Sequence, residues 1–176
     1  MRIGLLGAGR IGRAHGHVLA GIDEVDELLL ADPATEAAES LAAETGATLM
    51  PVETLLAEAD ALVICAMTDA HAPLVRAGLE RRIPIFCEKP LAADLANAIV
   101  LAEEVERAGV PFQLGFQRRF DTGYLEARRM VESGELGTLY CMRMAGHDPA
   151  PPHESYIPLS GGLFRDFSGH DFDILR

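Results

Sequence analysis

The chain has 176 residues, of which 49% are hydrophobic and 24% are charged, a balance typical of a folded globular protein. Its formal net charge of −12 argues against nucleic acid as a partner, because phosphate binding depends on dense lysine and arginine. No apolar run approaches the roughly 20 residues that a membrane helix needs. We therefore expect no membrane partner and a cytoplasmic protein.

Apolar strand-like runs alternate with segments of helical period along the first 114 residues. The expected strands are residues 2–6, 27–31, 61–66, 83–87 and 110–114. The expected helices are residues 11–20, 35–45, 52–59, 70–80 and 94–108. This alternation predicts an α/β fold, a Rossmann doubly wound parallel sheet with crossover helices. Gly46 and Gly109 follow two of the helices, where a left-handed cap is expected.

The character of the sequence changes after Gly115. A helix is expected over residues 121–133, a turn over 134–137 and a strand over 138–145, before an irregular segment rich in proline and glycine. We place a domain boundary near Asp121, so that residues 1–121 form one domain and residues 122–176 begin an α+β domain that is cut short.

The three cysteines, Cys65, Cys87 and Cys141, include no C-x-x-C pair. The first two lie in apolar strand-like runs, where a thiol behaves as a small hydrophobic group. We interpret all three as reduced core residues.

A glycine pattern, G-x-G-x-x-G, follows the first expected strand and opens the next helix. Its glycines are Gly7, Gly9 and Gly12. Without side chains, the backbone turns sharply and approaches a pyrophosphate, and Arg10 and Ile11 would complete the cofactor loop. The same pattern also fits a tight turn that binds nothing.

Asp32 lies 20 residues after Gly12, at the end of the second expected strand. A carboxylate there accepts hydrogen bonds from an adenosine ribose. It would also repel a 2′-phosphate, and the stretch ADPATEAAE offers no Lys or Arg to neutralise one, so NAD is favoured over NADP. The alternative is that Asp32 caps the following helix, because Asp-Pro is a common helix start.

Two more loops follow expected strands at the same edge of the sheet. Thr68 and His71 could line the ribose or nicotinamide side of the cofactor, or be a helix cap and a surface histidine. Glu88 and Lys89 would emerge into the crevice, where Lys89 could hydrogen-bond a substrate hydroxyl. Pro90 restricts Lys89 to an extended backbone or permits a cis peptide. The alternative is a solvated Glu-Lys pair before a helix.

Asp166 and His170 are four positions apart, so on one helix they would share a face. A histidine there can accept a hydroxyl proton as hydride leaves carbon, and a neighbouring carboxylate can orient it. The alternative is a surface ion pair on a helix. A zinc site on His147, His153 and His170 matches no compact ligand spacing, so no metal is expected.

Four segments together, GAGRIG, FCEKPLA, GFQRRFDTGY and GGLFRDFSGHDFD, resemble the glucose-fructose oxidoreductase, inositol dehydrogenase and MocA family. The pieces RRFDTGY and GHDPAPP are most similar to its inositol dehydrogenase branch. The resemblance implies that Lys89, Asp166 and His170 are catalytic, with His170 as the base. It also places further residues near the nicotinamide or the substrate: Glu88 and Gln117 on the cofactor side, and Arg118, Asp148 and Tyr156 on the substrate side.

The resemblance thus implies an NAD-dependent oxidoreductase that acts on a small cyclic polyol or sugar, with myo-inositol favoured. The first domain would bind NAD, and the second would serve substrate binding and assembly into a homo-oligomer, a dimer or tetramer when full length. The alternatives are another sugar dehydrogenase of the family and a non-catalytic dinucleotide-binding sensor.

The sequence departs from the family pattern in two respects. Met67 stands where many relatives have a proline-containing turn. Family members are also longer and build a large open antiparallel sheet after the Asp-x-x-x-His helix, whereas one strand over residues 138–145 cannot form a stable sheet alone. We therefore expect a truncated protein that binds dinucleotide but turns over poorly.

Overall fold

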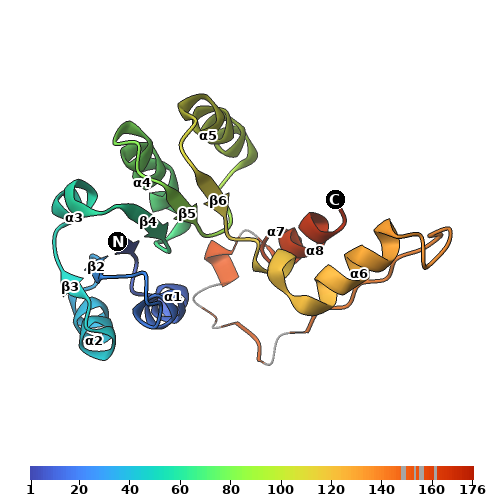
Figure 1. The fold of residues 1–176 in the computed structure, drawn as a ribbon, viewed down its shortest axis with the longest axis horizontal. Helices are drawn as coiled ribbons and strands as arrows, with labels where there is room; N and C mark the ends of the chain where they lie inside the picture. The colour runs from blue at the N-terminus through green and yellow to red at the C-terminus, as the bar shows by residue number, and fades with distance from the viewer. Residues whose placement is uncertain (148–149, 153, 155–156, 161) are drawn as a thin grey trace. The chain divides into compact units, whose positions relative to one another are not determined.

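The computed structural model describes residues 1–147, 150–152, 154, 157–160 and 162–176. The chain divides into two compact units, Met1–Gly115 and Phe116–Arg176 (Figure 1). The existence of a second, independent domain from residue 122 onward stays a prediction.

The first unit is built on a six-stranded sheet in the order β3-β2-β1-β4-β5-β6, with every neighbouring pair parallel. Parallel strands are covered by helices on both faces and so read as continuous apolar runs, which is what the sequence shows. The predicted doubly wound sheet is therefore confirmed. The strands are β1 Arg2–Leu6, β2 Glu27–Ala31, β3 Thr48–Leu49, β4 Ala61–Ile64, β5 Ile85–Cys87 and β6 Phe112–Leu114.

Side chains alternate between the two faces of the sheet and form two separate cores. Leu5 and Leu30 pack with Leu41 of α2 on one face, whereas Leu29 and Leu101 belong to the core on the other face. The helices of this unit are α1 Arg10–Ala20, α2 Thr35–Thr45, α3 Val52–Glu58, α4 Thr68–Glu80 and α5 Leu95–Ala108.

Strand boundaries differ from the sequence expectations where proline intervenes. β5 begins at Ile85 and β6 at Phe112, one residue after Pro84 and Pro111, because proline has no backbone N–H for the ladder. The short β3 was not predicted, since two residues carry no periodicity. Gly46 and Gly109 adopt the expected left-handed conformation after α2 and α5, with φ of 74° and 61°.

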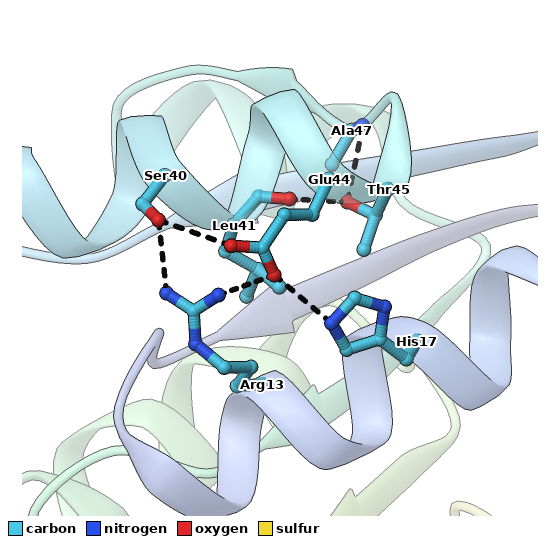
Figure 2. Close-up of polar contacts among 7 residues, drawn as sticks. All are labelled: Arg13, His17, Ser40, Leu41, Glu44, Thr45 and Ala47. Carbon is cyan, nitrogen blue, oxygen red and sulfur yellow. Dashed lines mark hydrogen bonds and ion pairs between the residues drawn. The ribbon is translucent and has the colours of Figure 1, made fainter.

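A polar network joins α1 to α2 (Figure 2). The Glu44 carboxylate pairs with Arg13 and lies 3.0 Å from Nε2 of His17, and the hydroxyl of Ser40 donates to it over 3.1 Å. Arg13 also donates to the Ser40 hydroxyl, over 3.1 Å. The network thus connects the helix after the glycine loop to the helix after Asp32.

The second unit contains short helices: η1 Gln117–Phe120, α6 Thr122–Glu132, η2 Ile157–Leu159, α7 Leu163–Asp166 and α8 Gly169–Ile174. The strand expected over residues 138–145 does not form, because these residues pair with no other strand among the described residues. Cys141 is exposed rather than in a core, which corrects that part of the cysteine interpretation.

The helix expected to carry both Asp166 and His170 is also interrupted. Asp166 ends α7, while His170 lies in α8, and residues 167–168 form a turn between them. Ser168 and Gly169 are weak helix formers, which explains the break. The two side chains are therefore not related by one turn of a continuous helix.

Candidate functional site: the carboxyl edge of the sheet

Parallel pairing brings the ends of β1, β4 and β5 to one edge of the sheet. The ladder continues past these ends: Gly7 N donates to Ala31 O, Cys65 N to Leu6 O and Glu88 N to Ile64 O, over 3.0, 2.7 and 2.9 Å. The glycine loop and the Glu88-Lys89 loop therefore lie at the same edge, where doubly wound sheets bind their ligands.

The three glycines of the loop differ in what their neighbours allow. Gly7 has φ of 115°, which disfavours any side chain. A Cβ on Gly12 would lie 2.0 Å from the carbonyl oxygen of Gly7, so the fold itself requires glycine there. A Cβ on Gly9, in contrast, would meet nothing within 4 Å. The fold does not explain Gly9, whereas the close approach of a ligand would.

Gly9 is the N-cap of α1, and no side chain caps this end of the helix. The first turn also contains no acidic residue. Backbone N–H groups at such an end are available to an anion, and the helix dipole favours negative charge there. The loop thus suits a pyrophosphate.

Asp32 follows β2 and binds backbone on two sides. One carboxylate oxygen accepts a hydrogen bond from Ala8 N over 2.6 Å, and the other accepts one from Ala34 N over 2.7 Å. The N-cap of α2 is Ala34, without a side-chain cap bond, so the alternative of Asp32 as the N-cap is wrong. The carboxylate is instead fixed beside the glycine loop.

An open pocket lies next to Asp32 at the ends of β2 and β3. It is lined by Leu30, Ala31, Asp32, Thr35, Ala38, Leu49 and Met50. Among these lining residues Asp32 is the charged one, and the others are apolar except Thr35. Such a lining suits the flat ring and ribose of an adenosine and gives no positive charge for a 2′-phosphate.

Thr68 and His71, the two cofactor residues expected after β4, differ in burial. Thr68 is the first residue of α4 and is half-buried. The side chain of His71 is 1% exposed, and its ring lies between two carbonyl oxygens, those of Ala66 and Pro90. His71 is buried, so the alternative of a surface histidine is wrong. A cofactor contact at Thr68 or His71 stays a prediction.

The loop after β5 holds Glu88, Lys89 and Pro90, with a cis peptide bond between Lys89 and Pro90. Oε1 of Glu88 lies 2.8 Å from Nε2 of His15 in α1, and Oε2 accepts a hydrogen bond from Lys89 N over 3.3 Å. A Cβ on Gly115 would lie 2.9 Å from the same carboxylate. Glu88 is therefore held in place by its neighbours and is not a freely solvated charge.

His15 was missed by the sequence reasoning. It lies three residues after Gly12, on the same side of α1, so helical spacing from the glycine motif was the available signal. Its ring also packs against Phe86, with 5.2 Å between the ring centroids.

The two core thiols are inert at this edge. Burial and the nearby Glu88 carboxylate raise the pKa of Cys87 to about 12, and burial with the same charge raises the pKa of Cys65 even further. Neither sulfur is a thiolate at neutral pH, which agrees with their interpretation as reduced core residues.

In the second unit, two arginines of η1 bind two aspartates of α8. Arg118 pairs with Asp171, and Arg119 donates to Asp173 from Nε over 2.7 Å. The ring of Phe116 meets the ring of His170 edge-on, with 6.0 Å between centroids. These contacts fix the short helix that carries the expected base.

Apart from Asp166, the other site residues expected in this unit are either exposed or outside the described residues. Gln117 is exposed at the start of η1. Asp148 and Tyr156 lie outside the described residues, as does His153 of the zinc alternative. The convergence of Lys89 with Asp166 and His170 stays a prediction.

Within the part of the chain that the structure describes, no three His, Cys, Asp or Glu side chains are grouped as a metal site. In the same part, no helix is long and apolar enough to cross a bilayer.

The fold and this edge define a dinucleotide-binding protein of the Rossmann class. Residues 1–116 match the model of an oxidoreductase family with an NAD-binding Rossmann fold, and residues 124–176 match the GFO/IDH/MocA C-terminal domain. The chain therefore belongs to the GFO/IDH/MocA oxidoreductase family, which confirms the resemblance seen in the sequence. NAD is the cofactor of this family's fold, as expected.

Relatives match along the whole chain. Inositol 2-dehydrogenase of Rhizobium meliloti is 36% identical, and myo-inositol 2-dehydrogenase of Thermotoga maritima is 37% identical, each over 100% of this chain. A scyllo-inositol dehydrogenase of Lactobacillus casei, solved with bound NAD(H) and scyllo-inositol, superposes with a TM-score of 0.89 at 27% identity, covering 100% of this chain and 55% of that one. The chain spans about half the length of the curated relatives, 54% in both cases.

Proposed function

We propose that the complete protein is an NAD-dependent dehydrogenase that oxidises a hydroxyl group of a cyclic polyol, with an inositol as substrate. The observation that carries this proposal is the edge built from the glycine loop, Asp32 and the adjoining apolar pocket. The similarity to inositol dehydrogenases supports the choice of substrate class.

The residues at the edge fit the cofactor. The open space at Gly9 and the uncapped start of α1, at Arg10 and Ile11, would accept the pyrophosphate, while Asp32 would bind the adenosine ribose. NAD supplies the hydride acceptor when it is bound. The open pocket beside Asp32 would hold one face of the adenine against its apolar lining.

On the substrate side, His170 would accept the hydroxyl proton while the carbon loses hydride, and Asp166 would orient its ring. Lys89 would hydrogen-bond the reacting oxygen and stabilise its developing charge. Glu88 and Gln117 would lie beside the nicotinamide, and further residues would contact the substrate: Arg118, Asp148 and Tyr156. The ion pair of Arg118 with Asp171 would set the direction of its guanidinium.

A homo-oligomer, a dimer or tetramer, and a cytoplasmic location belong to the same proposal. They rest on the resemblance to the family and on the composition of the chain.

Gly9→Ala tests the cofactor site. Because φ at Gly9 is −67° and a Cβ there meets nothing, the melting temperature of the variant should equal that of the wild type. It should nevertheless weaken NADH binding by about tenfold or more, roughly 1.4 kcal/mol, measured by NADH fluorescence titration. The matched variant Gly12→Ala should lose both stability and binding, because its Cβ collides with Gly7. Unchanged NADH affinity in Gly9→Ala would contradict a pyrophosphate at this loop.

A dehydrogenase screen of the complete protein tests the substrate. Inositol isomers and aldoses are offered with NAD and with NADP, and reduction is followed at the nicotinamide absorbance. We expect turnover of an inositol with NAD, abolished in Lys89→Ala and His170→Ala. Preference for an aldose would favour a sugar dehydrogenase. Bound NAD without turnover of any substrate would favour a sensor.

A further inference from the structure

His71 is the one buried polar or charged side chain among the described residues, with 1% of its surface exposed. It lies in the first turns of α4, yet both of its ring nitrogens contact backbone outside the helix. Nδ1 is 2.8 Å from the carbonyl oxygen of Pro90, and Nε2 is 3.0 Å from that of Ala66. The ring therefore lies between the loop after β4 and the loop after β5.

Both partners of the His71 ring are hydrogen-bond acceptors. A carbonyl oxygen only accepts hydrogen bonds, so each attractive contact requires a proton on the histidine nitrogen. A neutral ring has a single N–H and can satisfy one of the two carbonyls. The contact to Pro90 is the shorter one, and it is the one that reaches the loop of Lys89.

Pro90 directly follows Lys89, so fixing the Pro90 carbonyl fixes the backbone next to the lysine. On the other side of Lys89, its own N–H is held by the Glu88 carboxylate, which in turn contacts His15. The backbone of Lys89 is thus constrained from both sides, by His15 through Glu88 and by His71 through Pro90.

We propose that His71 is a positioning residue for Lys89, acting through a hydrogen bond from Nδ1–H to the carbonyl oxygen of Pro90. The proposal rests on the proposed function, because it assumes that Lys89 acts on substrate. A misplacement of about 1 Å at a reacting group can cost about a hundredfold in rate, so a bond to the neighbouring carbonyl is sufficient to matter.

Two substitutions separate the two contacts. In His71→Asn the side-chain amide nitrogen falls near the place of Nδ1 and keeps a donor toward Pro90. In His71→Gln the amide nitrogen falls near the place of Nε2 and keeps a donor toward Ala66. Both variants lose the ring and its packing, so a purely structural role would affect them alike.

In the complete protein, we expect kcat to fall about tenfold or more in His71→Gln and to stay within about threefold of wild type in His71→Asn. The KM for NAD should change little in either variant, because Gly9 and Asp32 are untouched. Equal losses of kcat in the two variants, or a loss confined to the KM for NAD, would overturn the proposal.

A second measurement does not depend on turnover. Ring ¹⁵N–¹H correlation spectra of the wild-type protein should show a hydrogen on Nδ1 of His71. A ring protonated on Nε2 alone would overturn the hydrogen bond even if the enzyme proved active. Absence of dehydrogenase activity with a protonated Nδ1 would instead count against the proposed function.

Discussion

The two compact units of the chain are stabilised in different ways. Among the described residues, all buried hydrophobic side chains lie in Met1–Gly115, where Leu5, Leu30 and Ile64 are fully buried. In Phe116–Arg176, large apolar side chains such as Tyr140 and Phe164 are exposed instead, by 92% and 79%. One unit is thus organised around a hydrophobic core, and the described residues of the other form no comparable core.

The difference shows what each unit relies on to hold its functional residues. In the first unit, burial on both faces of the sheet fixes the strand ends, so polar groups such as Asp32 and Glu88 are set by a rigid frame. In the second unit, α8 is attached to η1 by the ion pairs of Arg118 and Arg119. Ion pairs near the surface contribute less than burial, so we expect the second unit to be the less stable one.

The largest expected effect compares one apolar residue from each unit. Leu5→Ala removes a side chain that is 0% exposed and should lower the free energy of unfolding by about 2–5 kcal/mol, because it leaves a cavity. Phe164→Ala should change it by about 0.5 kcal/mol or less. Chemical denaturation of both variants measures the difference. Similar losses for the two would mean that Phe164 is covered in solution.

A smaller effect is expected at the ion pair of Arg119 with Asp173. The Asp173 side chain is 6% exposed, whereas Arg119 is 54% exposed. Solvent around Arg119 therefore weakens the attraction between the two charges. Arg119→Ala should destabilise the docking of α8 by about 1–2 kcal/mol and speed amide exchange in that helix. Arg128→Ala, which removes an exposed pair with Glu132 in α6, is the control and should leave α8 unaffected. Equal exchange in the two variants would refute a role for the η1 ion pairs.

The smallest effect concerns the network of Glu44 on the surface of the first unit (Figure 2). The hydrogen bond from Arg13 lowers the pKa of Glu44, with Ser40 and His17 adding to the effect and partial desolvation opposing it. Since the folded pKa is below the unfolded one, the stabilisation is present above about pH 4.3, the ordinary glutamate pKa, and disappears as pH falls through the folded value.

Glu44→Gln should therefore have a slightly lower melting temperature than wild type at pH 7, and the gap should close in acid. Thermal melts of both proteins between pH 7 and pH 3 measure it. A difference in melting temperature that grows toward low pH would contradict a lowered pKa of Glu44 in the folded protein.

Much of the fold could be predicted because its signals are local. β1, β2 and α2 match their predicted residues, since an apolar run or a helical period is visible within one segment. The glycine loop and Asp32 were likewise visible, because their spacing is fixed by one strand-turn-helix unit. The strand predicted over residues 138–145 is wrong because a strand is stable only when it pairs with another strand. The residues of one segment do not show whether such a partner is present.

The sequence by itself determined the doubly wound sheet, the glycine loop and the family, because short apolar and helical patterns or the order of the motifs indicate each of them. Only the tertiary structure decided that Glu88 contacts His15, 73 positions earlier, and that His71 lies between the carbonyls of Ala66 and Pro90. These contacts depend on which strands become neighbours in the sheet. The periodicity of one segment does not indicate which strands become neighbours. Burial of side chains across the whole sheet sets that order.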